Sequence, residues 1–321
     1  MFKQAAIVLA TMVLSSSFAA AQNAAPALKT FIRGTVSTTA VEWTDMIARQ
    51  KGFYAAEGLK IDQALISPTT ITPSLIGGSI QFGFINASSM ILADESGADL
   101  VAVGKGADPS PYALVAGKSI KTMADLKGKI ISLSEPGDAY AEATRVILRK
   151  AGIDPEKDVT MRYGGNSNQR MAALVAGAVD AVPLVPPQDA MLVQQGFNIV
   201  ARYVEDFPHL ALSTTAVSRA WAAKNGDVIK AFLRAQANAT KWLYDPANKE
   251  EALAILMSET KSDHASAQAA YDIYVLQLHM YAPCVEAEGF QTLIKLLSTF
   301  NKAVKSDEPA SRYIDTQWCP A

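Results

Sequence analysis

The sequence predicts an α/β protein of two similar lobes, one of them inserted into the other. A motif occurs twice, as PSLIGGSIQFGFI at residues 73–85 and as AALVAGAVDAVPL at residues 172–184. In each copy a short apolar helix ends at a Gly and an apolar strand follows; Gly suits this exit because it adopts the left-handed conformation at little cost. Around both copies, strands alternate with short helices, which is typical of a parallel-rich α/β sheet.

Length and composition fit this organisation. The chain has 321 residues, enough for one large or two medium domains. Its hydrophobic fraction of 50%, charged fraction of 19% and net charge of −2 are ordinary for a globular protein. No basic excess favours binding to nucleic acid, and no block of like charges predicts a disordered tail.

The N-terminus is typical of a secretory signal peptide, predicted over residues 1–21. Lys3 supplies a short basic region, Ala5 to Leu14 an apolar core, and Ala19-Ala20-Ala21 a small-residue cleavage site. The alternative is an uncleaved anchor. Because no second apolar stretch of about 18 uncharged residues follows, we expect the mature chain to be exported and soluble.

The first lobe is predicted over residues 22–111 and 217–321. Its expected strands cover residues 29–36, 59–67, 80–85 and 100–104, and its expected helices cover residues 40–50, 72–77 and 90–96. The C-terminal part shows helical spacing of apolar residues at 228–244, 248–259, 266–281 and 289–305. We expect these last helices to pack against the first lobe.

The second lobe is predicted over residues 112–216. The breaker cluster Asp108-Pro109-Ser110-Pro111 precedes it, and the extended runs 112–116 and 210–217 are the expected crossings between the lobes. Within the lobe we expect strands at 129–133, 159–163, 179–185 and 198–201, and helices or turns at 123–126, 139–150 and 190–195.

Four polar segments follow predicted strands, where open α/β sheets bind ligands. Each segment begins or precedes a helix, and free N–H groups at helix starts favour anions. With a nearby tryptophan, the candidate ligand-binding residues are Ser37, Thr38, Thr39, Trp43, Asn86, Ser88, Ser89, Gly137, Asp138, Asn166, Ser167, Asn168, Gln169 and Arg170. The alternative is that Ser37, Asp138 and Asn166 only cap helices.

Three of these candidates carry distinct alternatives. Arg170 stands at a helix start, where the dipole disfavours a cation, so it is expected either to reach for an anion or to lie on the surface. Trp43 is expected either to stack on a planar ligand or to pack the interior. Asp138 could bind an amine, which would favour a zwitterion such as taurine. Tyr112 and Tyr163 are expected to border the same cleft.

The chain lacks the patterns of common enzymes. Its three histidines, His209, His264 and His279, have no metal-ligand spacing, and no G-x-S-x-G motif occurs. We therefore expect no metal, no cofactor and no catalytic activity. The two cysteines, Cys284 and Cys319, are expected to form a disulfide in an oxidising compartment, with two buried thiols as the alternative.

An ordered set of segments resembles one family over nearly the whole mature chain. The segments are ARQKGFYAAEGLKID at 48–62, IGGSIQFGFINASS at 76–89, SIKTMADLKGKIISLSEPGD at 119–138 and AALVAGAVDA at 172–181. Together they resemble the periplasmic solute-binding proteins of ABC importers, in the group that binds nitrate, sulfonates and taurine and is related to thiamine-precursor-binding proteins. The resemblance implies a two-lobed type II periplasmic-binding-protein fold with two hinge crossings.

The same resemblance implies a function. We expect a monomeric periplasmic protein that captures a small organic anion, either a sulfonate or an aromatic or aliphatic carboxylate, and delivers it to a membrane permease. Two alternatives stay open at this point: an exported enzyme acting on a pyrimidine or an aromatic acid, and a module that serves a sensor. The thiamine-precursor relatives include synthases with a cysteine-rich motif, which this chain lacks.

Overall fold

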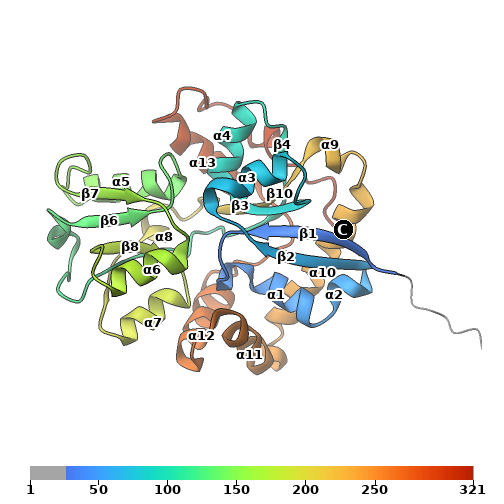
Figure 1. Ribbon diagram of the computed structural model, residues 1–321, viewed down its shortest axis with the longest axis horizontal. Helices are drawn as coiled ribbons and strands as arrows, with labels where there is room; N and C mark the ends of the chain where they lie inside the picture. Colours follow the sequence, from blue (N-terminus) through green and yellow to red (C-terminus); the bar gives the residue numbers. More distant parts are fainter. Residues whose placement is uncertain (1–26, 321) are drawn as a thin grey trace, which may run out of the picture.

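The computed structural model describes residues 27–320, so the predicted signal peptide at 1–21 lies outside the described residues. It contains two five-stranded mixed sheets with helices around each (Figure 1). This arrangement confirms the predicted α/β class. Within residues 27–320, no helix is both long and apolar enough to span a bilayer.

The first sheet has the strand order β2-β1-β3-β10-β4. β1 runs parallel to β2 and β3, whereas β10 runs antiparallel to both β3 and β4. The bounds are β1 Lys29–Thr35, β2 Leu59–Leu65, β3 Phe82–Asn86, β4 Leu100–Lys105 and β10 Ser213–Ser218.

The second sheet has the order β7-β6-β8-β5-β9, in which β6 runs parallel to its neighbours and β5 antiparallel to its own. Its bounds are β5 Ala113–Ala116, β6 Ile130–Leu133, β7 Thr160–Tyr163, β8 Ala181–Leu184 and β9 Asn198–Arg202. Both sheets therefore have the same order and directions. The repeated motif supplies the central strand of each, β3 and β8, together with the helix before it.

Helices connect the strands in both lobes. The first lobe has η1 Ala40–Glu42, α1 Trp43–Gln50, α2 Phe53–Ala56, α3 Pro68–Ile76 and α4 Ala87–Glu95. The second has η2 Met123–Leu126, α5 Ala139–Lys150, α6 Ser167–Val175, α7 Gln188–Gln194 and α8 Tyr203–Asp206. α3 and α6 end beside Gly78 and Gly177, whose φ values are 75° and 70°, as the motif predicts.

The C-terminal elements are mostly helical. They are α9 Arg219–Ala222, α10 Gly226–Tyr244, η3 Pro246–Asn248, α11 Lys249–Thr260, α12 His264–Tyr271, η4 Asp272–Gln277, α13 Ala287–Ser298 and η5 Ala310–Arg312. The expected helix 266–281 is in fact α12 followed by η4, a π-helical turn, and the expected helix 289–305 ends at Ser298. α10 and α11 pack on α1, so these two helices extend the first lobe, whereas α12 and α13 also contact α7 and α5 of the second lobe.

Two connections join the lobes, residues 106–112 after β4 and residues 207–212 before β10. Because β10 pairs with β3 and β4, residues 213–216 belong to the first sheet. The predicted second lobe, residues 112–216, includes these four residues. An apolar extended run has the same sequence pattern whether it crosses between the lobes or forms a strand within one of their sheets.

Trp43 lies in the interior of the first lobe. Its side chain is 0% exposed, its indole Nε1 donates to the carbonyl of Ala252 at 3.0 Å, and its ring meets Tyr271 edge-on. It thus anchors α11 and α12 to the start of α1. The Trp43 ring therefore packs the lobe interior and is not placed to stack on a ligand in the cleft.

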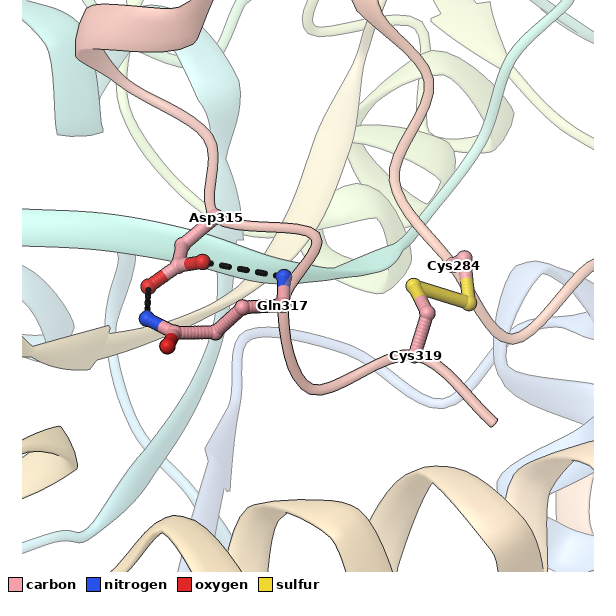
Figure 2. The surroundings of a disulfide bond; sticks show 4 residues. All are labelled: Cys284, Asp315, Gln317 and Cys319. Carbon is pink, nitrogen blue, oxygen red and sulfur yellow. Dashed lines mark hydrogen bonds between the residues drawn. A yellow bond between two sulfur atoms is a disulfide. The ribbon is translucent and has the colours of Figure 1, made fainter. Parts of the chain in front are cut away.

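The C-terminal tail covers an edge of the first sheet. Ile314 bridges Ala102 of the edge strand β4, and Cys284 bridges Gly104 of the same strand. Figure 2 shows the predicted disulfide between Cys284 and Cys319, which the structure confirms, beside a turn in which Asp315 accepts from Gln317. The tail thereby occupies hydrogen-bonding groups that an open edge would expose.

Removing the disulfide should destabilise the fold. The bond closes a chain segment of 35 residues, and losing such a constraint typically costs about 2–4 kcal/mol. We expect urea unfolding to show that the Cys284→Ser, Cys319→Ser double variant has lost this amount of unfolding free energy. Wild-type protein with its disulfide reduced should unfold at the same urea concentration as the double variant. A double variant as stable as oxidised wild type would contradict this structural role.

Candidate functional site

A cleft lies where the two lobes face each other. Its volume is about 480 Å³, including its mouth to solvent, and a neighbouring hollow of about 390 Å³ shares six of its residues. We treat the two as one cleft. The lining residues that both share are Val36, Ser37, Asn86, Tyr112, Ser167 and Leu212.

The cleft lies at the carboxyl ends of the strands, where the sequence placed it. Ser37 follows β1, Asn86 ends β3, and Ser134 follows β6. The loop after β7 adds Asn166, Ser167 and Arg170 of α6. Both lobes therefore contribute polar groups to one cavity.

Ser88 and Ser89 join the lobes next to this cleft. The backbone N–H of Ala139 donates to Ser88 Oγ at 3.2 Å, Ser88 Oγ donates to Asp138 Oδ1 at 3.5 Å, and Ser89 Oγ donates to Glu135. Neither serine is among the lining residues. Because these bonds need both lobes together, the structure represents a closed arrangement.

Arg170 is the cation of the cleft. It is 6% exposed, and its Nη1 donates to the carbonyl of Gly165 at 2.7 Å and its Nη2 to Ser167 Oγ at 3.3 Å. Nε has no hydrogen-bond partner, and among residues 27–320 no carboxylate lies within 4 Å of the guanidinium. The positive charge is buried with only neutral partners, although buried charges are normally paired.

Asp138 lines the same cleft but its carboxylate is already bonded. It caps α5 by accepting from the backbone N–H of Tyr140 at 3.1 Å, and it also accepts from Ser134 and Ser88. Burial raises its pKa above the usual range, and the hydrogen bonds oppose that rise. The capping alternative for Asp138 therefore holds, and its place in the wall keeps it close to a ligand.

The rest of the predicted 165–170 segment divides between cap and cleft. Asn166 and Gln169 form a capping box, with bonds of 3.0 Å and 2.8 Å, and Asn168 accepts from Gln188 at 2.6 Å. Asn168 and Gln169 are exposed and line neither hollow. Their prediction as ligand contacts is not supported by this geometry, whereas Asn166, Ser167 and Arg170 do line the cleft.

Other predicted residues also lie outside the wall. Thr39 lines the cleft beside Ser37, but Thr38 does not, and neither does Trp43. Gly137, at φ 77°, shapes the turn before α5 without lining the cavity. Tyr163, which was expected to border the cleft, is 37% exposed and accepts from Arg145 on the surface.

Tyrosines form one wall of the cleft. Tyr112 and Tyr140 both line it, with ring centroids 4.4 Å apart, and Tyr203 packs behind them. The Tyr140 hydroxyl donates to Ser110 Oγ at 3.0 Å. Tyr112 is one of the residues predicted to border the cleft, whereas Tyr140 is not among the predicted residues. Its position two residues after Asp138, at the start of the same helix, could have indicated that it lies near the cleft.

Glu42 reaches the edge of the cleft with its charge already matched. It forms a buried ion pair with Arg33 and accepts from Thr35, and Arg33 also lies 3.5 Å from Asp45. Burial raises the pKa of Glu42, with the charge of Arg33 opposing that rise. No group of three or more metal-ligating side chains gathers anywhere in residues 27–320. Arg170 is thus a cation of the cleft that has no ion-pair partner among residues 27–320.

Comparisons with known proteins agree with this architecture. The chain is 24% identical over 244 residues to the putative binding protein YtlA of Bacillus subtilis, covering 74% of this chain and 72% of that protein. It is 32% identical over 183 residues to a putative aliphatic sulfonates-binding protein of Escherichia coli, covering 56% and 55%. The alkanesulfonate-binding protein SsuA of Xanthomonas axonopodis pv. citri, solved bound to MOPS, matches with a TM-score of 0.70 at 20% identity, covering 91% and 99%.

A family comparison covers more than half of the sequence. Residues 43–249 match the family described as NMT1/THI5 like. The match begins at α1 in the first lobe, includes the whole second lobe and ends at the start of α11. The chain therefore belongs to the NMT1/THI5-like family.

Proposed function

We propose that this chain is the substrate-binding protein of an ABC-type importer and that it captures a small organic anion between its lobes. The observation that carries the proposal is the buried guanidinium of Arg170, which lines the cleft and has no carboxylate partner in the part of the chain that the structure describes. Leaving such a charge unpaired costs several kcal/mol. An anionic ligand in the cleft would supply the missing partner for this charge.

The mechanism would be closure around the ligand. Ser37 and Asn86 come from the first lobe, and Ser134 and Arg170 from the second. A ligand that touches both sets gains contacts only when the lobes are together, so its binding shifts the population towards the closed arrangement. The closed form would then be what a membrane permease receives.

The apolar part of the wall favours an organic ligand over a bare inorganic ion. Leu133, Pro183 and Leu212 line the cleft together with the rings of Tyr112 and Tyr140. These groups offer nothing to an ion as small as nitrate but would cover a hydrocarbon body. A sulfonate or a carboxylate, aliphatic or aromatic, matches both the cation and these surfaces.

Location and partner are part of the same proposal. The predicted signal peptide would export the chain to the periplasm, where a monomer would meet the permease. The relatives reported above are named as binding proteins, which argues against the alternative of an exported enzyme.

A zwitterionic ligand is the second candidate for the same cleft. Asp138 and Arg170 line it together, and they form no ion pair within 4 Å of each other. A ligand with an acid at one end and an amine at the other could bridge the two. The satisfied hydrogen bonds of Asp138 favour the simple anion instead.

Ethanesulfonate and taurine separate these candidates because they differ by one amine. In a thermal-shift screen of residues 22–321, a ligand at 100 times its dissociation constant should stabilise the fold by about 2.7 kcal/mol. We expect ethanesulfonate and small carboxylates to raise the melting temperature at least as much as taurine does. Stabilisation by taurine alone would establish the zwitterion. A screen in which no anion shifts the transition would overturn the proposed ligand class.

A further inference from the structure

A second cavity lies against the connections between the lobes. We call it the crossing cavity. Its walls are residues 110–112 of the first connection, Arg202 and Val204 at the end of β9 and in α8, and the turn η4 with Leu278. Its volume is about 620 Å³, including its mouth, which is larger than the corresponding 480 Å³ of the main hollow of the cleft.

The crossing cavity combines apolar walls with one cation. Pro111, Val204, Ile273 and Leu278 supply apolar surface, and Arg202 is partly buried among them. Among residues 27–320 no carboxylate lies within 4 Å of the Arg202 guanidinium, and no side-chain hydrogen bond engages it. Buried Asp189 lies close enough for the Arg202 charge to oppose the rise that burial causes in its pKa, but the two form no ion pair. The cavity therefore matches an amphipathic ligand with one negative charge, whose head would meet Arg202 and whose hydrocarbon body would meet the apolar walls.

The helical wall of the cavity has an unusual geometry. η4 is a π-helical turn, in which the N–H of Leu278 donates to the carbonyl of Ile273 at 2.9 Å. Its residues Ile273 and Gln277 both line the cavity. Such turns are rare and occur frequently at functional sites, so the widened turn is a second observation that favours a ligand here.

The crossing cavity adjoins the cleft at Tyr112 and the tyrosines packed on it. Tyr112 lines both, and Tyr140 of the cleft donates to Ser110 of the crossing cavity at 3.0 Å. Tyr203, between the two lining residues of α8 and β9, packs on the Tyr112 ring at 6.1 Å. An occupant would touch η4 of the first lobe and β9 of the second, so it would depend on how the lobes are arranged.

We propose that the crossing cavity binds an amphipathic carboxylate, with its head on Arg202 and its hydrocarbon tail against Val204, Ile273 and Leu278. Its walls come together from both lobes in the closed arrangement. An occupant that prefers this arrangement raises the affinity of the cleft for its own ligand, and the cleft ligand raises the affinity of the crossing cavity by the same factor. The existence of this second site does not depend on the identity of the cleft ligand.

Octanoate is the probe for the test, measured by isothermal titration calorimetry on residues 22–321. Two matched Arg→Gln variants distinguish the sites. Arg202→Gln removes the head-group partner and should weaken octanoate binding about tenfold or more, because a charge-assisted hydrogen bond is lost. Because the cleft is itself proposed to take carboxylates, Arg170→Gln is also the background for the comparison. It should leave octanoate binding in the crossing cavity within about twofold, and adding Arg202→Gln to it should weaken that binding about tenfold or more.

A third variant tests the apolar half of the proposal. Val204→Trp should fill the cavity and abolish octanoate binding, with circular dichroism checking that the variant is folded. If it does not fold, the two Arg→Gln variants decide alone. Octanoate that binds Arg202→Gln normally but fails to bind Arg170→Gln occupies the cleft and overturns the proposal. Wild-type protein that shows no octanoate binding overturns it as well.

Discussion

Arg170→Gln is expected to weaken binding of the cleft ligand by roughly 30-fold or more. Truncating one member of a buried, hydrogen-bonded charge pair costs about 2–5 kcal/mol, and each 1.4 kcal/mol is tenfold in affinity. Arg170 is buried, and its existing bonds go to a carbonyl and a hydroxyl. Glutamine is too short to reach the Gly165 carbonyl that Nη1 contacts, so circular dichroism should check that the variant is folded. Isothermal titration calorimetry with the strongest anion from the thermal-shift screen measures the loss.

Asn168→Ala on the same helix is the matched control. Asn168 is exposed and accepts from Gln188, so its truncation should cost about 1 kcal/mol of stability and leave affinity within about twofold. Equal losses of affinity in both variants would mean that the first turn of α6 as a whole recognises the ligand, and not the charge of Arg170. Unchanged affinity in Arg170→Gln would remove the basis for an anionic ligand.

The contrast between Asn168 and Arg170 shows what the sequence could predict about the site. The strand ends were predictable, because alternating strands and helices place the loops after β1, β3, β6 and β7 at one edge of each sheet. The direction in which each side chain points was not predictable in the same way. Once α6 is known to begin at Ser167, residues three apart share a face. That spacing turns Ser167 and Arg170 to the cleft and leaves Asn168 and Gln169 off it.

Other features depend on contacts that no local pattern contains. The fold class could be predicted from the repeat, because each copy is one continuous segment that contains both a helix and a central strand of its sheet. The place of Tyr140 in α5 depends on its hydrogen bond to Ser110, which lies in the first connection between the lobes. The boundary at β10 depends on pairing with β3 and β4, which are more than 100 residues earlier. Pairing partners of this kind are set by the folded arrangement and not by local sequence.

Trp43 is the clearest case, and it gives the largest expected loss of stability. Trp43→Ala should lower the free energy of unfolding by about 3–5 kcal/mol, since it leaves a cavity where a whole aromatic ring was buried. It also leaves the Ala252 carbonyl without its indole donor. Urea unfolding monitored by circular dichroism measures this change.

Affinity distinguishes packing from stacking in this variant. Because the Trp43 ring lines no part of the cleft, folded Trp43→Ala should bind the cleft ligand within about threefold of wild type once its lower stability is accounted for. Trp43→Phe is the gentler companion: it keeps most of the apolar volume, loses the bond to Ala252, and should cost about 1–2 kcal/mol. A stable Trp43→Ala protein with greatly weakened binding would show that the ring does contact the ligand. A destabilised Trp43→Ala protein that still binds the ligand normally would place α11 and α12 among the elements that hold the first lobe rigid while the cleft closes. The reason is that Trp43 joins both helices to the start of α1.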